Sequence, residues 1–137
     1  MGEDTPKELA DIVKEVSREL SESFLRAIFE RRILESVIRE FALDLRDAIV
    51  VREPMLPGGF RPDLMIMFKD VAVVIEFKAS RTLPSETPLV VRKYAEVLRK
   101  VTGIEKVYSI IVCLRETKIE ESVEELAKRL DIRILRV

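Results

Sequence analysis

Histidine, tryptophan, asparagine and glutamine are all absent from the 137-residue sequence. Without histidine, the chain cannot use a Ser-His or Cys-His nucleophile system, and a His-ligated zinc site is excluded. Without Asn or Gln, the usual bidentate recognition of adenine is not available, which argues against a base-reading transcription factor. The lack of thermolabile amides, together with abundant Glu, Arg and Lys, is typical of adaptation to high temperature.

Cysteine and long apolar runs are scarce as well. Cys113 is the single cysteine, so no intrachain disulfide can form and a reducing compartment is favoured. No apolar run approaches the ~20 residues that a membrane span requires, and the acidic start lacks the pattern of a signal peptide. We therefore expect a cytoplasmic protein without a membrane partner. The net charge of −1 gives no overall positive field for nucleic acid, although basic residues can gather around one cleft.

The length suits one domain, residues 1–137, and the composition of 47% hydrophobic and 36% charged residues is that of a globular protein. Apolar residues at helical spacing predict an additional N-terminal helix at about 6–20 and a longer helix at about 23–45. The elements that follow are predicted as strands at 47–52, 61–68 and 71–79, a helix at 89–102, a strand at 107–114, a helix opening at 117 and a strand at 131–137.

The predicted order is ααβββαβαβ, which indicates an α/β fold. Only Lys69 and Asp70 separate the second and third strands, so these two strands must form an antiparallel hairpin. A three-strand meander followed by β-α-β units predicts a mixed five-stranded sheet with helices on both faces. Gly103 is placed to end the helix at 89–102, and the residues Thr117 to Glu120 form a capping box for the next helix.

The residues with the clearest chemistry lie on this hairpin. If its loop is symmetric, with Phe68 opposite Val71, Asp63 lies directly opposite Glu76, with Cβ atoms ~4.5–5.5 Å apart. Two facing carboxylates repel each other, so a chain that keeps them together is expected to bind a cation between them. Hard oxygen ligands favour Mg²⁺ or Mn²⁺, with water and a substrate phosphate completing the shell.

Lys78 lies two residues beyond Glu76 and therefore on the same face of the strand. Its ammonium group would orient the attacking water in phosphodiester hydrolysis and offset the charge that builds up on the phosphate. The alternative is an edge hairpin whose solvent face carries these three charges. The apolar run from Val71 to Ile75 argues against an edge strand, and charges that begin at a strand end are typical of α/β ligand sites.

The motif Arg61-Pro62-Asp63, followed after twelve residues by Glu76-Phe77-Lys78, resembles the signature of the PD-(D/E)XK nuclease superfamily. The order of helix, three-strand meander, helix and strand over residues 24–114 is similar to the restriction-endonuclease-like core of that superfamily. Archaeal Holliday-junction resolvases and small restriction-like nucleases are the most similar members in size. The resemblance implies that Asp63 and Glu76 are metal ligands and that Lys78 is the catalytic lysine.

Many members of this superfamily add a glutamate from the helix before the meander. Glu35 is our candidate because it flanks the apolar stripe of that helix, whereas Glu40 points away and Glu30 lies on the opposite flank. The alternative is a solvated Glu35 paired with Arg31 or Arg39 at helical spacing. Residues that flank the proposed site, or line a path toward it, are candidates for substrate binding: Arg61, Ser80, Arg81 and Lys93.

Three functions are compatible with these patterns. The first is a Mg²⁺-dependent endonuclease that acts on DNA, including branched or otherwise structured DNA. The second is a non-catalytic relative that keeps the fold as a DNA-binding or assembly module, and the third is an unrelated α/β domain with accidental charges. The intact Asp/Glu/Lys trio favours the first. The near-neutral charge and the small size favour a partner or a dimer, and the apolar face of the helix at 6–20 offers a surface for pairing, so we expect a homodimer.

Overall fold

A computed structural model describes residues 9–16, 18–19, 23, 27, 30–32, 35, 39 and 48–136. Most of the helix predicted at 23–45 therefore lies outside the described residues, but positions 30–32 within it are helical. The elements are β1 (Ile49–Arg52), β2 (Leu64–Met67), β3 (Val71–Lys78), α2 (Thr87–Thr102), β4 (Lys106–Cys113), α3 (Glu121–Arg129) and β5 (Ile132–Arg136).

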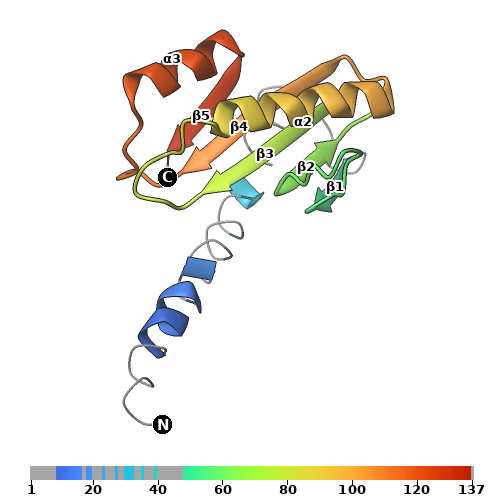
Figure 1. Ribbon diagram of the computed structural model, residues 1–137. Coiled ribbons are helices and arrows are strands. Elements are labelled where there is room, and N and C mark those ends of the chain that lie inside the picture. Colours follow the sequence, from blue (N-terminus) through green and yellow to red (C-terminus); the bar gives the residue numbers. More distant parts are fainter. Residues whose placement is uncertain are drawn as a thin grey trace.

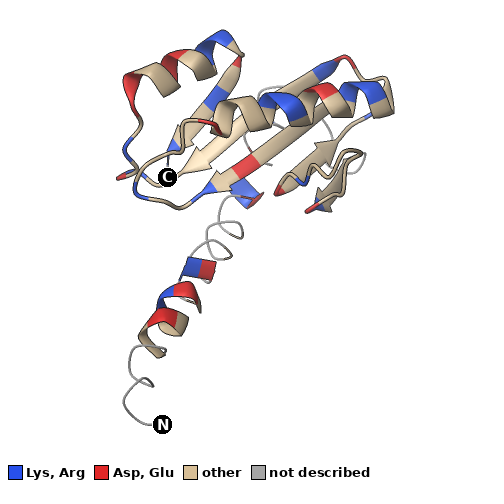
Figure 2. Ribbon diagram, viewed as in Figure 1, with Lys and Arg blue, Asp and Glu red and all other residues tan. Residues whose placement is uncertain are grey.

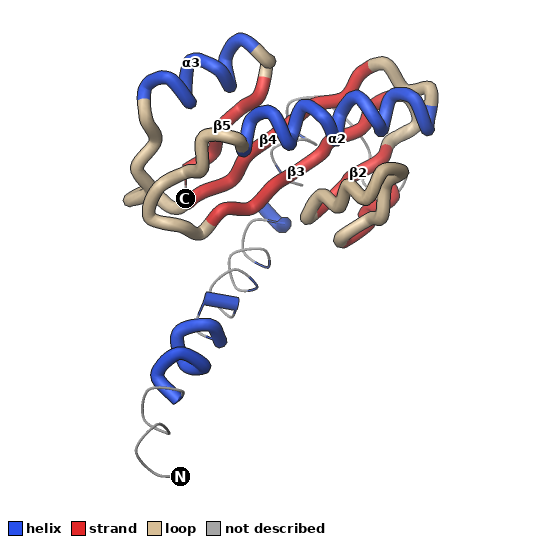
Figure 3. The backbone as a smooth tube through the Cα atoms, in the orientation of Figure 1, coloured by secondary structure: helices blue, strands red, loops and turns tan. Residues whose placement is uncertain are grey.

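The five strands form one sheet in the order β1-β2-β3-β4-β5 (Figures 1 and 3). The first three strands pair antiparallel, and β4 and β5 then add in parallel. This topology confirms the predicted α/β fold with a meander followed by two β-α-β units. The hairpin needs only two residues between its strands, whereas each parallel step requires a crossover, and α2 and α3 provide these crossovers.

Both of these helices lie on the same face of the sheet (Figure 3). Parallel crossovers are right-handed, and two of them that step in the same direction across a sheet place their helices on one side. The apolar residues of this face contact α2 and α3, whereas a second apolar cluster that includes Ile75 and Phe77 occupies the opposite face. Helices on both faces were predicted, but the residues predicted to form the helix for this second face lie mostly outside the described part of the chain.

The central position belongs to β3, whose residues Val71 to Phe77 are all buried. Each fully buried Val or Ile side chain contributes roughly 1.5–3 kcal/mol to the free energy of unfolding. Because the run is too short for a membrane helix and too apolar for an edge, it specifies a strand that is covered on both faces. Glu76 is the one ionisable residue within this buried run.

The predicted helix ends are partly correct. Gly103 ends α2 with φ of 73°, and its N–H donates to the carbonyl of Arg99 at 2.9 Å, which confirms the predicted C-cap. The capping box at Thr117 is wrong, because α3 begins at Glu121 with an extended Glu120 before it. Thr117 is only 2% exposed, and its hydroxyl donates to the carbonyl of Ser80 at 2.9 Å. That bond between loops takes the hydroxyl that would otherwise cap the helix.

Residues 9–16 are helical, within the N-terminal helix predicted at 6–20, and extend away from the sheet (Figure 1). Their apolar residues Leu9, Ile12, Val13 and Val16 are 47 to 60% exposed. In the part of the chain that the structure describes, no helix is long and apolar enough to cross a membrane.

Candidate active site

The hairpin register brings Asp63 and Glu76 together. Leu64 lies opposite Ile75 and Met65 opposite Val74, so the paired numbers sum to 139 as predicted. Asp63 precedes the first residue of β2, which makes Asp63 and Glu76 the next pair along the hairpin. The N–H of Phe68 donates to the carbonyl of Val71 at 2.8 Å and closes the short loop. This loop fixes the register, and a slip of one residue would move Glu76 to the other face.

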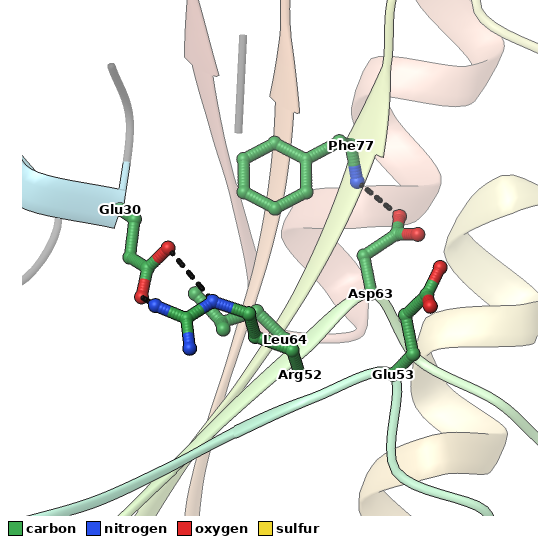
Figure 4. Close-up of a pocket in the computed structure, with 6 residues that line it drawn as sticks. All are labelled: Glu30, Arg52, Glu53, Asp63, Leu64 and Phe77. Atoms are coloured by element: carbon green, nitrogen blue, oxygen red, sulfur yellow. Dashed lines mark hydrogen bonds and ion pairs between the residues drawn. The ribbon is translucent and has the colours of Figure 1, made fainter. Parts of the chain in front are cut away.

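The Asp63 carboxylate is held by the backbone of the neighbouring strand. Its Oδ2 accepts a hydrogen bond from the N–H of Phe77 at 2.7 Å (Figure 4). The carbonyl of Asp63 in turn accepts a hydrogen bond from the N–H of Glu53 at 3.0 Å. Both ends of the residue are therefore fixed between β3 and the segment that follows β1, and the carboxylate is oriented before any ligand binds.

Glu76 is 7% exposed, and its carboxyl group contacts that of Asp63. Burial, followed by the hydrogen bond and the negative charge of Asp63, raises the pKa of Glu76 from 4.5 to about 8. The hydroxyl of Tyr94 and the charge of Lys78 act in the opposite direction. Near neutral pH, Glu76 is therefore protonated, and a bound cation would favour the release of that proton.

Tyr94 contacts this carboxyl pair, although the sequence analysis did not identify it as a candidate. It projects from α2, where it is 7% exposed and its ring meets that of Phe60 edge to face, with centroids 6.2 Å apart. Its hydroxyl donates to the carbonyl of Arg61 at 3.4 Å and also lies within hydrogen-bonding reach of the Glu76 carboxyl group. Burial, and then the charge of Glu76, raise the pKa of Tyr94, so the hydroxyl stays protonated as a donor. A tyrosine in the apolar stripe of a helix can pack in the core or bond a site residue, and the sequence pattern is the same in both cases.

Lys78 ends β3 on the same face as Glu76, because side chains alternate along a strand. Its charge lowers the pKa of Glu76, so its ammonium group lies within electrostatic reach of the carboxyl pair. The side chain is partly exposed, and its backbone lies opposite Cys113 on β4. The three residues of the predicted trio therefore occupy one end of the β2–β3 hairpin.

A cavity of about 110 Å³ opens beside Asp63. Glu53 and Asp63 line it together, and both side chains point toward it (Figure 4). Across the cavity, the guanidinium of Arg52 donates two hydrogen bonds to the carboxylate of Glu30. Nε donates to Oε2 at 3.3 Å, and Nη2 donates to Oε1. Glu76 is not among the residues that line this cavity.

The structure does not bring Glu35 into this cavity. Its carboxylate lies 3.6 Å from the guanidinium of Arg31, which is the helical ion pair that the sequence offered as an alternative. The acidic residue that reaches the cavity from the N-terminal helical region is Glu30, on the opposite flank of the stripe. The spacing of the apolar residues places Glu30 and Glu35 on opposite flanks of the helical stripe. It does not determine which flank faces the hairpin.

The four candidates for substrate binding have different surroundings. Arg61 is exposed beside the hairpin, and its guanidinium lies 3.7 Å from the carboxylate of Glu53. Ser80 donates its hydroxyl to the carbonyl of Thr82 at 2.8 Å, whereas the side chain of Arg81 is exposed. Lys93 is paired with Glu96 at 3.7 Å on the outer side of α2. Arg61 therefore lies two residues before Asp63 and Arg81 three residues after Lys78, whereas Lys93 is paired with Glu96.

The donor set of the pair fits a hard divalent cation with an incomplete protein shell. Asp63 and Glu76 offer adjacent carboxylate oxygens, the ligand type that Mg²⁺ and Mn²⁺ prefer. Burial, and then the hydrogen bond and charge of Asp63, raise the pKa of Glu76, so a cation bound at the pair would favour its charged form. Within the described residues, no group of three or more acidic or thiol side chains is close enough to hold a metal. Two carboxylates would leave most coordination positions to water and to a substrate phosphate.

No protein-family model matches the chain, and no curated protein shows significant similarity to it. Solved structures do resemble its fold. A repair endonuclease from Pyrococcus abyssi superposes with a TM-score of 0.52 at 20% identity, covering 79% of this chain and 46% of that one. EndoMS in a complex with double-stranded DNA superposes with a TM-score of 0.54 at 19% identity, covering 79% of this chain and 44% of that one.

At these levels of identity the likeness concerns the fold alone. The chain spans less than half of the length of either structure, so what those whole proteins do is not thereby assigned to it. The part of this chain that superposes on them belongs to a mixed five-stranded sheet with flanking helices.

Proposed function

We propose that this chain is a divalent-metal-dependent endonuclease of the PD-(D/E)XK type that hydrolyses DNA phosphodiester bonds. The observation that carries the proposal is the contact between Asp63 and Glu76 at the end of a buried hairpin, with Lys78 next on the same face. Ionisable groups whose pKa is shifted by burial and by a specific charged neighbour, as that of Glu76 is, cluster at functional sites. The fold shared with two endonuclease structures supports the same assignment.

In this proposal Asp63 and Glu76 hold one Mg²⁺ or Mn²⁺ ion, which when bound supplies a Lewis acid for the phosphate and lowers the pKa of water. The hydrogen bond from Phe77 keeps the Asp63 carboxylate turned toward the site. The Tyr94 hydroxyl favours the charged form of Glu76, which is the form that binds a cation. Lys78 orients the attacking water and compensates charge on the phosphate as the transition state is approached.

The test is cleavage of linear, branched and single-stranded DNA with Mg²⁺ or Mn²⁺ present. Wild-type protein should cleave at least one of these forms, and Glu76→Ala should not cleave any of them. Asp70→Ala is the matched control, because Asp70 is an exposed acidic residue in the turn at the other end of the same hairpin. Cleavage by Glu76→Ala at the wild-type rate would refute the proposed site. The comparison of DNA forms also identifies the preferred substrate structure.

The competing function is a non-catalytic DNA-binding or assembly module. The specific observation in its favour is that, among the described residues, only two acidic side chains meet at the site. Within the described part of the chain, no group of three or more such side chains could hold a metal ion. Wild-type protein that binds DNA and cleaves no form of it, with either metal, would establish this alternative.

We further propose that residues 1–137 act as one nuclease-like domain that pairs as a homodimer through the N-terminal helix. The apolar face of residues 9–16 is exposed, and a short helix of this kind is only marginally stable in water without a packing partner. Sedimentation velocity should give a dimer for wild type and a monomer for Val13→Glu. Lys14→Glu is the control, since Lys14 lies on the charged side of the same helix. A monomeric wild type would exclude the homodimer.

A further inference from the structure

The C-terminal ends of β3, β4 and β5 carry a cluster of basic residues outside the carboxyl pair. Its members are Lys78, Arg81, Arg115, Lys118 and Arg136, which we call the basic edge, and the one acidic residue among the same loop residues 78–82 and 113–118 is Glu116. Figure 2 shows these basic segments gathered around the strand ends near the C-terminus. The chain as a whole has a net charge of −1, so this concentration is local.

The backbone of the basic edge is fixed by hydrogen bonds between two loops. Thr82 and Lys118 form a parallel bridge. The N–H of Lys118 donates to the carbonyl of Arg81 at 2.7 Å, and the N–H of Leu83 donates to the carbonyl of Lys118 at 2.9 Å. The buried hydroxyl of Thr117 adds its bond to Ser80. The loop that follows Lys78 and the loop that follows β4 therefore form one unit.

Arg136 connects β5 to these two loops through hydrogen bonds. Its Nη1 donates to the carbonyl of Arg115 at 3.2 Å and also to the carbonyl of Thr117. Arg136 lies opposite Cys113, which lies opposite Lys78, so one row of residues crosses the ends of three strands. Two strand spacings correspond to about 10 Å, which is the rise of roughly three base pairs along a duplex.

The side chains of Arg81, Arg115 and Lys118 are exposed, and none of them forms an ion pair with any residue that the structure describes. Some basic residues elsewhere on the surface have carboxylate partners, as Arg52, Arg61, Arg92 and Lys93 illustrate, whereas Lys100 and Lys106 have none among the described residues. The basic edge differs from the rest of the surface in that these three exposed side chains lie on two adjacent loops beside Lys78, with Glu116 as the one acidic residue of those loops. Such a row provides contacts for phosphates without reading the base sequence.

We infer that the basic edge binds the phosphate backbone of the DNA on one side of the bond that is cleaved. This inference rests on the proposed function and adds the direction in which the DNA leaves the site, from Lys78 across β4 toward β5. Arg115 and Lys118 are the two residues that carry it, because neither belongs to the carboxyl site. Arg136 acts as a positioning residue through the loop backbone.

The test is the salt dependence of binding to a fluorescently labelled DNA duplex, measured by anisotropy in EDTA so that no cleavage occurs. Arg115→Ala/Lys118→Ala should weaken binding tenfold or more at low salt and should reduce the slope of log K against log salt by about two. Arg115→Lys/Lys118→Arg should keep the wild-type slope, because it preserves both charges. Since the exchanged side chains are exposed, thermal melting should be unchanged for both variants.

The matched control is Lys100→Ala/Lys106→Ala. These residues are exposed and lack ion pairs within the described part of the chain, and Lys106 begins β4 about 23 Å from its other end. Equal effects of the two double variants, or no effect of Arg115→Ala/Lys118→Ala in a protein that binds and cleaves DNA, would overturn the inference and leave the proposed function intact. Wild type that neither binds nor cleaves DNA would overturn both. Tighter binding of a matched RNA duplex would overturn DNA as the partner.

Discussion

Raising the pH should destabilise this protein through a single residue. The pKa of Glu76 is 4.5 as a free side chain and about 8 in the folded state, so the folded protein binds more protons than the unfolded chain between these values. The stabilising contribution of protonated Glu76 is therefore complete below pH 4.5 and is lost as the pH rises through 8. The full difference corresponds to about 5 kcal/mol, of which roughly 3 kcal/mol falls between pH 5.5 and 8.

The composition makes this effect measurable. Because the chain contains no histidine, the N-terminal amino group is the main other group that normally titrates between pH 5.5 and 8. Thermal unfolding followed by circular dichroism at constant ionic strength, in EDTA, should show a fall in Tm on the order of 10 °C across this range. Mg²⁺ added at pH 8 should restore much of the loss, whereas at pH 5.5 it should have little effect because a protonated carboxyl is a poor ligand.

Glu76→Gln is the control for this experiment, since the amide is neutral at every pH and close to the protonated carboxyl group in shape. The Tm of this variant should be nearly independent of pH over the same range. Parallel profiles for wild type and Glu76→Gln would refute the assignment of the pH dependence to Glu76. A wild type that becomes more stable toward pH 8 in EDTA would show that the sign is wrong.

Three further outcomes are expected at the site. Asp63→Asn should lower the pKa of Glu76, because it removes the neighbouring charge, and a carbon-detected NMR titration measures this pKa. The same variant should abolish Mg²⁺ binding, as measured by calorimetry. Tyr94→Phe should raise the pKa of Glu76 further and shift Mg²⁺ binding to higher pH, with a loss of about 1 kcal/mol in stability from the missing hydrogen bond. Lys78→Ala should reduce cleavage at least 100-fold while calorimetry shows Mg²⁺ binding close to wild type, and Lys69→Ala in the turn should leave both unchanged.

The hairpin was predictable because two independent constraints agree on it. A gap of two residues allows only an antiparallel pair, and the apolar run of β3 requires a strand that is buried on both faces. Together they fix which residue lies opposite Glu76, and the register follows. The order of the remaining strands follows from the short connections and the handedness of the crossovers.

The features that the sequence did not reveal depend on contacts between distant segments. The residues Thr117 to Glu120 satisfy the capping pattern, but the carbonyl of Ser80, 37 positions earlier, competes for the same hydroxyl. Tyr94 satisfies the periodicity of a packing residue, and only the three-dimensional structure places its hydroxyl at Glu76. Local patterns describe what a residue is able to do, whereas tertiary neighbours determine which of these roles it takes.

The strand order in the sheet, β1 to β5, is the same as the order of the strands along the chain. During synthesis, each strand that leaves the ribosome therefore finds the neighbour it pairs with already present, and no strand has to insert between two others. The hairpin with its carboxyl pair can form while β5 is still inside the exit tunnel. Arg136 reaches the loops only after β5 has paired, so a nascent chain would have the acidic pair before the loops beside it become fixed.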